Sequence, residues 1–238
     1  MSDAYGSKLG DNKIIESWSK NATPWILAIQ KKTIESRKLV TDQAIIEAVL
    51  SVSSVRVLDI GCGEGWLARA LSSRERSVSG IDVIPELVEA ARKNNDGEFH
   101  VMAYEELAEE RIYEIFKWGQ KYDTAVSNFS LLGESAVEHI FKVLPSILND
   151  RGYFIVQTLH PIECCGEYSY ESGWREGSWE GFDDEFCDPA PWYFRTLEAW
   201  RALFFRNGFE IVQCREPVHP KTGKPASLLL IGKKTLLT

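Results

Sequence analysis

"VLDIGCGEGWL", residues 57–67, joins a run of apolar residues to a turn that holds three glycines. The apolar run predicts a buried strand with Asp59 at its tip. Glycine costs backbone entropy, so Gly61, Gly63 and Gly65 indicate a turn that a ligand approaches closely. We therefore expect a strand, a glycine-rich turn and a helix around a phosphate, a dinucleotide or another nucleotide-like cofactor.

Strands and helices alternate along most of the chain, which predicts a parallel sheet with helices on both faces. The link between the last two strands is short enough for a hairpin, so the final strand is expected to run antiparallel. We expect strands at residues 54–60, 76–82, 98–103, 122–129, 153–159, 209–214 and 227–232, and helices at residues 85–92, 105–118, 134–148 and 196–205. A turn is expected at residues 150–152, and Thr196 is expected to cap the last helix.

Two segments depart from this alternation. Residues 1–52 read as a helical cap, because apolar residues recur at helical spacing over residues 13–38. Thr23-Pro24 is a signal for a helix restart, and Thr41 is expected to cap the next helix. Residues 160–192 are rich in glycine, aromatic residues and acids, have no clear period, and are longer than a usual connection. We call this second segment the insertion.

The charge balance and the cysteines exclude several classes of protein. A formal net charge of −8 argues against a nucleic-acid partner, because such binding draws on Lys and Arg. The N-terminal residues are polar, and no run approaches the ~18 apolar residues of a membrane span. Five cysteines show no repeated CxxC spacing, and Cys164, Cys165 and Cys187 near His160 fit no zinc pattern. We expect no metal, no membrane segment and a cytoplasmic setting.

The glycine turn distinguishes between nucleotide-binding patterns. A P-loop is excluded because the GK[ST] ending is absent. The dinucleotide fingerprint needs a glycine where this chain has Trp66. The pattern Asp-x-Gly-x-Gly-x-Gly instead resembles the first motif of class I S-adenosylmethionine-dependent methyltransferases. "GIDVIPELVEAAR", residues 80–92, resembles their second motif, and its Asp82 stands where an acid can accept both ribose hydroxyls.

The resemblance covers about residues 53–235 and implies a fold. That fold is an α/β, Rossmann-like, doubly wound, mostly parallel seven-stranded sheet with an antiparallel last strand. A helical cap (1–52) and a lid insertion (160–192) would complete a single methyltransferase domain over residues 1–238. "IESR" at 34–37 and "HP" at 160–161 resemble a bacterial small-molecule subgroup.

The resemblance also implies where the cofactor, S-adenosyl-L-methionine, binds. The acid that usually receives the adenine amine is expected near position 103, which here is alanine, so a neighbouring side chain or a backbone carbonyl would replace it. The implied contacts are Asp59, Gly61, Cys62 and Gly63 at the turn and the methionine end, Asp82 and Val83 at the ribose, Ala103, Tyr104 and Glu105 at the adenine, and Asn128 and Phe129 at the methionine moiety.

Two more residues have both a functional and a simpler interpretation. Arg37 is either a solvated charge near a helix end or a clamp on the cofactor's carboxylate, which suits a guanidinium fork. His160 follows a strand's carboxyl end, and an imidazole suits a general base. Its simpler role is to order the loop before Pro161. A base is needed only when the acceptor must lose a proton, because the sulfonium methyl is already electrophilic.

The insertion is expected to form a lid over the methyl acceptor. Its aromatic side chains suit a flat or apolar acceptor and can steady a sulfonium cation. Between residues 163 and 188 it carries nine acids against Arg175 alone, which should repel anions and tolerate neutral or cationic molecules. The simpler interpretation is a solvated loop whose aromatic residues pack on the sheet.

The sequence therefore predicts an enzyme that methylates an oxygen or nitrogen of a small, neutral or cationic, aromatic or apolar molecule. S-adenosyl-L-homocysteine would be the product of the cofactor. Two alternatives stay open. One is a catalytically silent S-adenosylmethionine-binding sensor or subunit. The other is an NAD-dependent oxidoreductase, which Trp66 disfavours.

Overall fold

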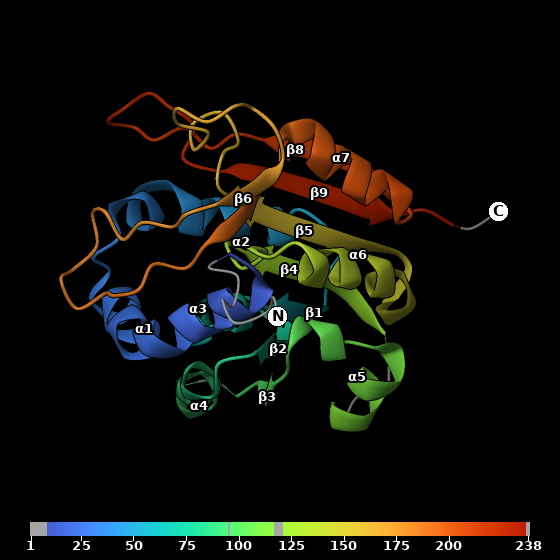
Figure 1. Ribbon diagram of the computed structural model, residues 1–238. Coiled ribbons are helices and arrows are strands. Elements are labelled where there is room, and N and C mark those ends of the chain that lie inside the picture. Colours follow the sequence, from blue (N-terminus) through green and yellow to red (C-terminus); the bar gives the residue numbers. More distant parts are fainter. Residues whose placement is uncertain (1–8, 95, 117–120, 237–238) are drawn as a thin grey trace, which may run out of the picture.

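The main sheet contains seven strands in the computed structural model, which describes residues 9–94, 96–116 and 121–236. These strands are β1 (Arg56–Ile60), β2 (Ser77–Asp82), β3 (Glu98–Val101), β4 (Tyr122–Asn128), β5 (Leu148–Thr158), β8 (Phe209–Arg215) and β9 (Leu228–Lys234). They lie in the order β3-β2-β1-β4-β5-β9-β8 (Figure 1). The first five pair in parallel, whereas β9 is antiparallel to both β5 and β8. The expected sheet is confirmed.

Helices cover both faces of this sheet. One layer is α2 (Asp42–Leu50), α3 (Trp66–Ser72) and α4 (Pro85–Asn94), and the other is α5 (Glu109–Ile115), α6 (Ser135–Ile147) and α7 (Leu197–Arg206). Alternate side chains of a strand enter opposite layers, so Val57 packs with the first layer and Leu58 with the second. Ile155 and Phe154 divide in the same way on β5. The doubly wound architecture is therefore confirmed.

The order of the strands reverses between β1 and β4, so the loops after these strands separate at the carboxyl edge of the sheet. The turn after β1 closes onto the neighbouring strand, because the N–H groups of Gly61 and Cys62 both donate to the carbonyl of Ile81, at 2.8 and 3.0 Å. This geometry opens the crevice in which α/β sheets bind ligands.

The N-terminal helices differ from the prediction. Helix α1 (Asp11–Lys31) runs unbroken through Pro24, so Thr23-Pro24 does not restart it. Its side chains pack on the loop before α4 through Ala22 and Ile84, and this packing outweighs the hydrogen bond that proline removes. A five-residue π-helical turn (Arg37–Thr41) then continues directly into α2. Thr41 is helical and its side chain caps nothing, so the predicted cap was wrong.

Three other boundaries need comment. The residues of the predicted turn at 150–152 lie within β5, although Arg151 has a φ of +62° that leaves a kink in the strand. The helix predicted over 105–118 is instead a short 3₁₀ turn (Tyr104–Glu106) followed by α5, and its last two residues lie outside the described part. Thr196 does cap α7, because its hydroxyl accepts the N–H of Ala199 at 3.1 Å.

The insertion contains β6 (Gly173–Arg175), which pairs with β7 (Trp192–Phe194) at its end, and otherwise runs as loops. In Figure 1 it passes, in orange, alongside α1 in blue. No helix among the described residues is long and apolar enough to cross a membrane. The carboxyl edge of the sheet is thus flanked by two segments that come from distant parts of the chain.

Asp11 joins the first of these segments to the core. Its carboxylate accepts the N–H of Glu134 at 2.7 Å, the hydroxyl of Ser135 at 2.6 Å and the N–H of Ala136 at 3.0 Å. These groups stand at the first turn of α6, where N–H groups lack helical partners and a negative charge is favourable. The first residue of α1 therefore caps a helix more than a hundred positions away.

We predict that Asp11→Ala lowers the free energy of unfolding by about 1–2 kcal/mol, because this substitution removes an anionic cap. Urea unfolding measures the change. Asp11→Asn should lose less, since an amide oxygen still accepts one N–H. Glu16→Ala is the matched control, because Glu16 is an exposed acid of the same helix. An unchanged unfolding midpoint for Asp11→Ala would contradict the assignment of this cap.

Candidate active site

A cavity of about 480 Å³ lies at the carboxyl edge of the sheet, beside the reversal in strand order. Small-molecule sites occupy roughly 300–1,000 Å³. Its wall combines the glycine turn, the ends of β2 and β4, the N-terminal helices and the insertion. The predicted cofactor residues that line it are Arg37, Gly61, Cys62, Gly63, Asp82, Val83, Tyr104, Glu105, Asn128 and Phe129. Asp59, Ala103 and His160 are described residues that do not line it.

The glycines of the turn have different roles. Gly61 and Gly63 both take positive φ angles, +72° and +55°, which favour glycine. A Cβ atom at Gly61 would overlap the side chains of Ser130 and Tyr104. At Gly63 it would meet only the indole nitrogen of Trp25, at 3.8 Å. Gly61 therefore permits close packing, whereas Gly63 presents bare backbone to the cavity.

Asp82 ties this turn to the end of β2. Its Oδ2 accepts the N–H of Gly63 at 2.9 Å, and its Oδ1 accepts the N–H of Ile84 at 3.0 Å. Burial raises the pKa of Asp82, and the hydrogen bonds from the backbone oppose this shift. Each carboxylate oxygen keeps a further lone pair, so Asp82 can also accept hydroxyl groups from a ligand.

Asp59 and Glu64 are buried beneath the turn. Asp59 is 2% exposed, and its Oδ2 has no hydrogen-bond partner among the described residues. Burial raises the pKa of Asp59 to about 8, and the nearby charges of Asp82 and Glu64 add to the shift. Glu64 is compensated by Arg69, whose guanidinium lies 2.5 Å from its Oε2. Asp59 is therefore mostly protonated at neutral pH and costs free energy whenever it ionises.

Tyr104 and Glu105, predicted at the adenine, line the cavity, and Ala103 stands next to them in the chain. The Tyr104 hydroxyl is occupied, because it donates to the carbonyl of Ser130 at 3.1 Å, and burial raises the pKa of this tyrosine. The N–H of Ala103 is also occupied and donates to the carboxylate of Glu106 at 2.8 Å. Glu105 lines the cavity and is exposed, so its carboxylate is free to accept from a ligand.

The loop after β4 contributes a strained and a buried group. Asn128 lines the cavity, and its Oδ1 is buried with no hydrogen-bond partner in the described part of the chain. Phe129 has a φ of +54°, which is rare for a bulky residue. Its N–H donates to the carbonyl of Gln157 at 2.8 Å, which holds that conformation. Strained backbone and an unpartnered polar atom together are typical of a ligand site.

Arg37 is buried, so its interpretation as a solvated charge was wrong. The side chain is 10% exposed, and its Nε lies 2.9 Å from the carboxylate of Asp42. The guanidinium stacks over the ring of Trp66, at 4.5 Å from the centroid, and lies 5.6 Å from that of Trp25. Its Nη2 is buried and makes no hydrogen bond to any described residue. One edge of the guanidinium is thus left for a ligand in the cavity.

His160 has neighbours that match its simpler interpretation. The side chain is 6% exposed, its Nε2 lies 3.2 Å from the carboxylate of Glu216, and its Nδ1 accepts the N–H of Glu163 at 3.4 Å. Both ring nitrogens are therefore engaged in ordering the loop that starts the insertion. The cysteines are free, and the described residues contain no group of three or more His, Cys, Asp and Glu side chains that could hold a metal.

Aromatic residues from α1 and from the insertion form the roof of the cavity. Trp18 lies edge-on to Trp25, with centroids 5.1 Å apart, and edge-on to Trp179 of the insertion, at 5.6 Å. Phe182 lies 6.5 Å from Trp25 and 5.3 Å from Trp179. Trp192 completes this wall. Trp179, Phe182 and Trp192 of the insertion thus line the cavity, whereas Tyr168, Tyr170, Trp174, Phe186 and Tyr193 are not among its described lining residues.

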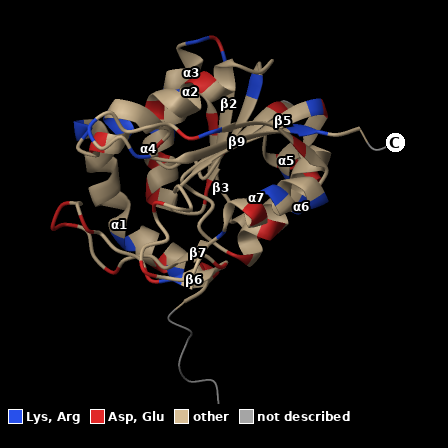
Figure 2. Cartoon of the chain, turned by 90° about the horizontal axis from the view of Figure 1, so that it is seen from above, with Lys and Arg blue, Asp and Glu red and all other residues tan. Residues whose placement is uncertain are grey.

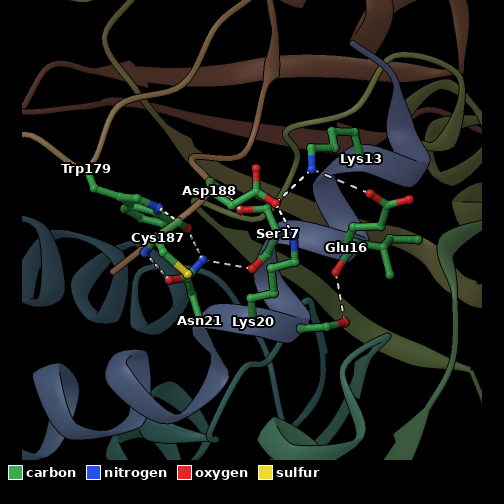
Figure 3. A network of polar contacts seen from close by, with 10 residues as sticks. Lys13, Glu16, Ser17, Lys20, Asn21, Trp179, Cys187 and Asp188 are labelled. Atoms are coloured by element: carbon green, nitrogen blue, oxygen red, sulfur yellow. Dashed lines mark hydrogen bonds and ion pairs between the residues drawn. The ribbon is translucent and has the colours of Figure 1, made fainter. Parts of the chain in front are cut away.

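A polar network, which we call the latch, holds the two halves of this roof together (Figure 3). Asn21 donates to the carbonyl of Cys187 at 2.7 Å and accepts its N–H at 2.9 Å. Ser17 donates to the carbonyl of Asp188 at 2.5 Å, and the carboxylate of Asp188 lies 2.8 Å from Lys13 and 2.5 Å from Lys20. The latch thus consists of the polar contacts between one face of α1, from Lys13 to Asn21, and residues 187–188.

The acids of the insertion do not face the cavity. None of the nine is among its described lining residues, whose members from the insertion are Gly177, Ser178, Trp179, Phe182, Ala190 and Trp192. Asp188 pairs with α1, and Glu163 pairs with Lys224 at 3.2 Å. The loop beside α1 carries its other acids on the outside (Figure 2). Their charge therefore acts at the surface and does not form the wall around an acceptor.

Several lining residues were not predicted from the sequence. Thr41 is 1% exposed, and its Oγ1 has no hydrogen-bond partner within the described ranges. The others include Asp11, Ile14, Ile34, Trp66, Ser130, Leu132, Leu159 and Ala226. The apolar periodicity of residues 13–38 was a usable signal for Ile14 and its neighbours. No sequence signal connects Ala226, in the loop between β8 and β9, with this site.

Comparison with known proteins agrees with this geometry. Residues 26–214 match the family described as methyltransferase domain. A putative S-adenosylmethionine-dependent methyltransferase from Listeria monocytogenes has the same fold, with a TM-score of 0.63 and 20% identity over 81% of this chain and 97% of that one. An uncharacterized methyltransferase of Schizosaccharomyces pombe is 26% identical over 70% of this chain and 64% of its own length.

A shorter match connects the chain to a Xylella fastidiosa ubiquinone biosynthesis O-methyltransferase, 37% identical over 67 residues. That match spans 26% of this chain and 27% of the relative. The family match covers most of the chain, so the protein belongs to the methyltransferase domain family. Together with the sheet order and the glycine turn, this places it among the class I S-adenosylmethionine-dependent methyltransferases.

We predict that Asp59→Asn stabilises the free protein, and that the gain grows with pH. Between the ordinary carboxyl pKa of 3.8 and about 8, the folded state keeps the proton that the unfolded state has lost. Wild-type stability therefore falls as pH rises through this window and levels off above it, by about 1.4 kcal/mol per unit at most. Asparagine does not titrate, so it avoids this loss.

Thermal unfolding at pH 4.5, 6, 7 and 8.5 tests the prediction. The difference in melting temperature between Asp59→Asn and wild type should be small at the lowest pH and reach several degrees at the highest. Glu98→Gln, a change at a partly exposed carboxylate of the edge strand, is the control for a general charge effect. A difference that stays constant across the series would show that Asp59 does not carry the buried proton.

Proposed function

We propose that this protein binds S-adenosyl-L-methionine in the cavity and transfers its methyl group to a small, uncharged aromatic or apolar molecule held under the aromatic roof. The observation that carries the proposal is one continuous cavity that runs from the glycine turn and Asp82 to Trp18, Trp179 and Trp192. Its first part has the polar groups that a nucleoside and an amino acid need. Its second part is walled by apolar side chains.

The unpartnered groups of the wall fit this cofactor. Asp82 would accept the ribose hydroxyls, and Glu105 would receive the adenine amine beside the ring of Tyr104. The methionine moiety would lie over Gly63, where a Cβ atom is absent and the backbone is open. The buried Nη2 of Arg37 would bind its carboxylate, as the sequence suggested. Val83, Cys62 and Phe129 supply the apolar contacts between these groups.

Two more groups suit the positive charge of the bound cofactor. The unpartnered Oδ1 of Asn128 can accept a hydrogen bond from its ammonium group. Asp59, beneath the turn, is buried and mostly protonated in the free protein. A cation placed above Asp59 would lower the pKa of its carboxyl and release the proton, which repays part of the burial cost.

The chemistry then depends on alignment and on the exclusion of water. S-adenosylmethionine supplies a methyl group on a sulfonium that is already electrophilic. The indole of Trp25 lines the cavity beside Gly63, and we propose that its ring steadies that cation. Trp179 and Phe182 close the roof and shield the reacting atoms from solvent. Positioning of this kind supplies much of the rate in reactions between two bound molecules.

The part of the cavity under the aromatic roof, where we place the acceptor, is apolar. The described lining residues of the cavity include no imidazole. The carboxylate of Asp11 is saturated by three donors of α6, so it is a poor base. We therefore propose that His160 orders the loop that starts the insertion. We also propose that the methyl group goes to an oxygen or nitrogen that reacts without a protein base. The Xylella relative is an O-methyltransferase, but the match is too short to carry the acceptor atom over.

Binding at the glycine turn can be tested by Gly63→Val, which we predict to weaken S-adenosylhomocysteine binding at least a hundredfold by occupying the open space over the turn. Isothermal titration calorimetry measures the affinity. Gly223→Val is the matched control, because Gly223 also has a positive φ, +70°, and open space around its Cβ position, but does not line the cavity. Both variants carry the same backbone strain.

The outcomes separate the candidates. Loss of binding in Gly63→Val with normal binding in Gly223→Val supports the proposed cofactor site. Normal affinity in both would refute it. A silent sensor would bind S-adenosylmethionine equally well, so the alternative is tested by incubation with labelled cofactor and a library of small aromatic amines, phenols and carboxylates. Tight binding without any labelled product would favour the sensor.

We also propose that the insertion is a lid, closed by the latch. Opening the roof requires breaking the polar contacts of α1 with residues 187–188 and the ring contacts of α1 with Trp179 and Phe182. A roof that must open to exchange cofactor and product needs low local stability. A few hydrogen bonds on one helical face meet that need better than an extended apolar interface would.

We predict that Asn21→Ala raises the amide exchange rate of residues 180–190 about tenfold or more in the free protein, since it removes the acceptor of the Cys187 N–H and one of two donors to the Cys187 carbonyl. The second donor, the indole N–H of Trp179 at 2.9 Å, remains. Hydrogen–deuterium exchange with mass spectrometry measures this effect. Ser19→Ala, on the exposed side of α1, should leave the exchange unchanged. Equal exchange in wild type and Asn21→Ala would show that the latch does not hold the insertion.

A further inference from the structure

The π-helical turn before α2 places a second unpartnered group in the wall of the cavity. Thr41 lines the cavity, is 1% exposed, and its Oγ1 has no hydrogen-bond partner among the residues described. A buried hydroxyl without a partner is costly, and native structures rarely keep one without a reason.

The hydroxyl of Thr41 does not use its usual partner. A threonine inside a helix commonly donates to the carbonyl four positions earlier, which here is that of Arg37. That carbonyl accepts the N–H of Asp42, five positions later, as a π turn requires, and the Oγ1 of Thr41 makes no hydrogen bond to it. Single π turns inside α-helices occur frequently at functional sites. The hydroxyl of Thr41 is therefore available to another acceptor.

Arg37 stands one turn away in the same wall and has an unpartnered group of its own. Its Nε edge is held by Asp42 at 2.9 Å, and its plane is fixed by the ring of Trp66. Its Nη2 is buried and makes no hydrogen bond in the described structure. Side chains four positions apart lie on one side of a helix, and both residues line the same cavity.

Two buried donors, one of them cationic, define the chemistry of the missing partner. A guanidinium edge and a hydroxyl satisfy the two oxygens of a carboxylate, and a charge-assisted hydrogen bond is the strongest kind available there. The open backbone of Gly63 belongs to the same part of the wall, because Trp25 lies beside Gly63 and its ring is 5.6 Å from the guanidinium of Arg37. A carboxylate bound at these donors would therefore lie beside the glycine turn.

We propose that Thr41 is the second donor of a carboxylate subsite built by the π turn, and that this subsite selects ligands carrying the amino-acid end of S-adenosylmethionine. The inference rests on the proposed cofactor site. It makes Thr41 a specificity-determining residue, because a nucleoside without the carboxylate gains nothing from it. The hydroxyl stays unpaired until such a ligand binds, so the free protein carries the cost of burying it.

The experiment compares two ligands on three proteins. Thr41→Val keeps the shape and removes the hydroxyl, and Thr41→Ser keeps the hydroxyl. Isothermal titration calorimetry gives the affinities for S-adenosylhomocysteine and for 5′-methylthioadenosine, which lacks the amino-acid end. Thr41→Val should weaken S-adenosylhomocysteine binding about tenfold or more, leave 5′-methylthioadenosine binding unchanged, and unfold at the same or a higher temperature. Thr41→Ser should bind both ligands nearly as wild type does.

The outcomes distinguish this inference from the function on which it rests. Equal binding of S-adenosylhomocysteine by wild type and Thr41→Val overturns the role of Thr41 and leaves the proposed cofactor site intact. An equal loss for both ligands also overturns it, since Thr41 would then only support the wall. If wild type binds neither ligand, the cofactor site itself fails. A loss confined to S-adenosylhomocysteine supports the carboxylate subsite.

Discussion

Three carboxyl groups, Asp59, Glu64 and Asp82, are buried under one glycine turn, and the rest of the site depends on how their charges are compensated. Asp82 is held by the backbone N–H groups of Gly63 and Ile84, and Glu64 by Arg69. The Oδ2 of Asp59 has no hydrogen-bond partner among the described residues, and burial raises the pKa of this carboxyl to about 8. Selection for stability alone would not retain this arrangement, because a buried carboxyl group with an unsatisfied oxygen lowers the free energy of unfolding. The cost is understandable if a cation binds above the turn.

The second constraint is that the sheet supplies only the floor of the cavity. The roof comes from α1 and from the insertion, which are separated by most of the chain and meet through the latch and the tryptophan cluster. Asp11 fixes the start of α1 to α6 with three hydrogen bonds, so the helix has a firm anchor at one end. The insertion meets α1 through the five polar contacts of the latch, two of them salt bridges of Asp188, and through the ring contact of Trp18 with Trp179. The roof is therefore held both to the core, through Asp11, and across its own seam, through the latch.

The sequence predicted what depends on local patterns and missed what depends on distant contacts. The alternation of strands and helices, the glycine turn and Asp82 all follow from spacing along the chain, and the structure confirms the sheet that they imply. The restart at Thr23-Pro24 failed because packing of α1 outweighs one lost backbone hydrogen bond. The cap at Thr41 failed because a π turn, which has no sequence signature, carries the helix through. No local pattern indicates that Asp11 caps α6.

The acids of the insertion show why charge counted along a sequence does not define a binding wall. None of them lines the cavity, while the same segment turns Trp179, Phe182 and Trp192 inward. An acceptor inside the cavity therefore meets aromatic faces and aliphatic side chains and no free carboxylate from the insertion. Shape and desolvation would select it, and a charged acceptor would lose its hydration without gaining a partner. The acidic surface would act earlier, by disfavouring the approach of anions to the mouth of the cavity. A neutral acceptor satisfies both conditions.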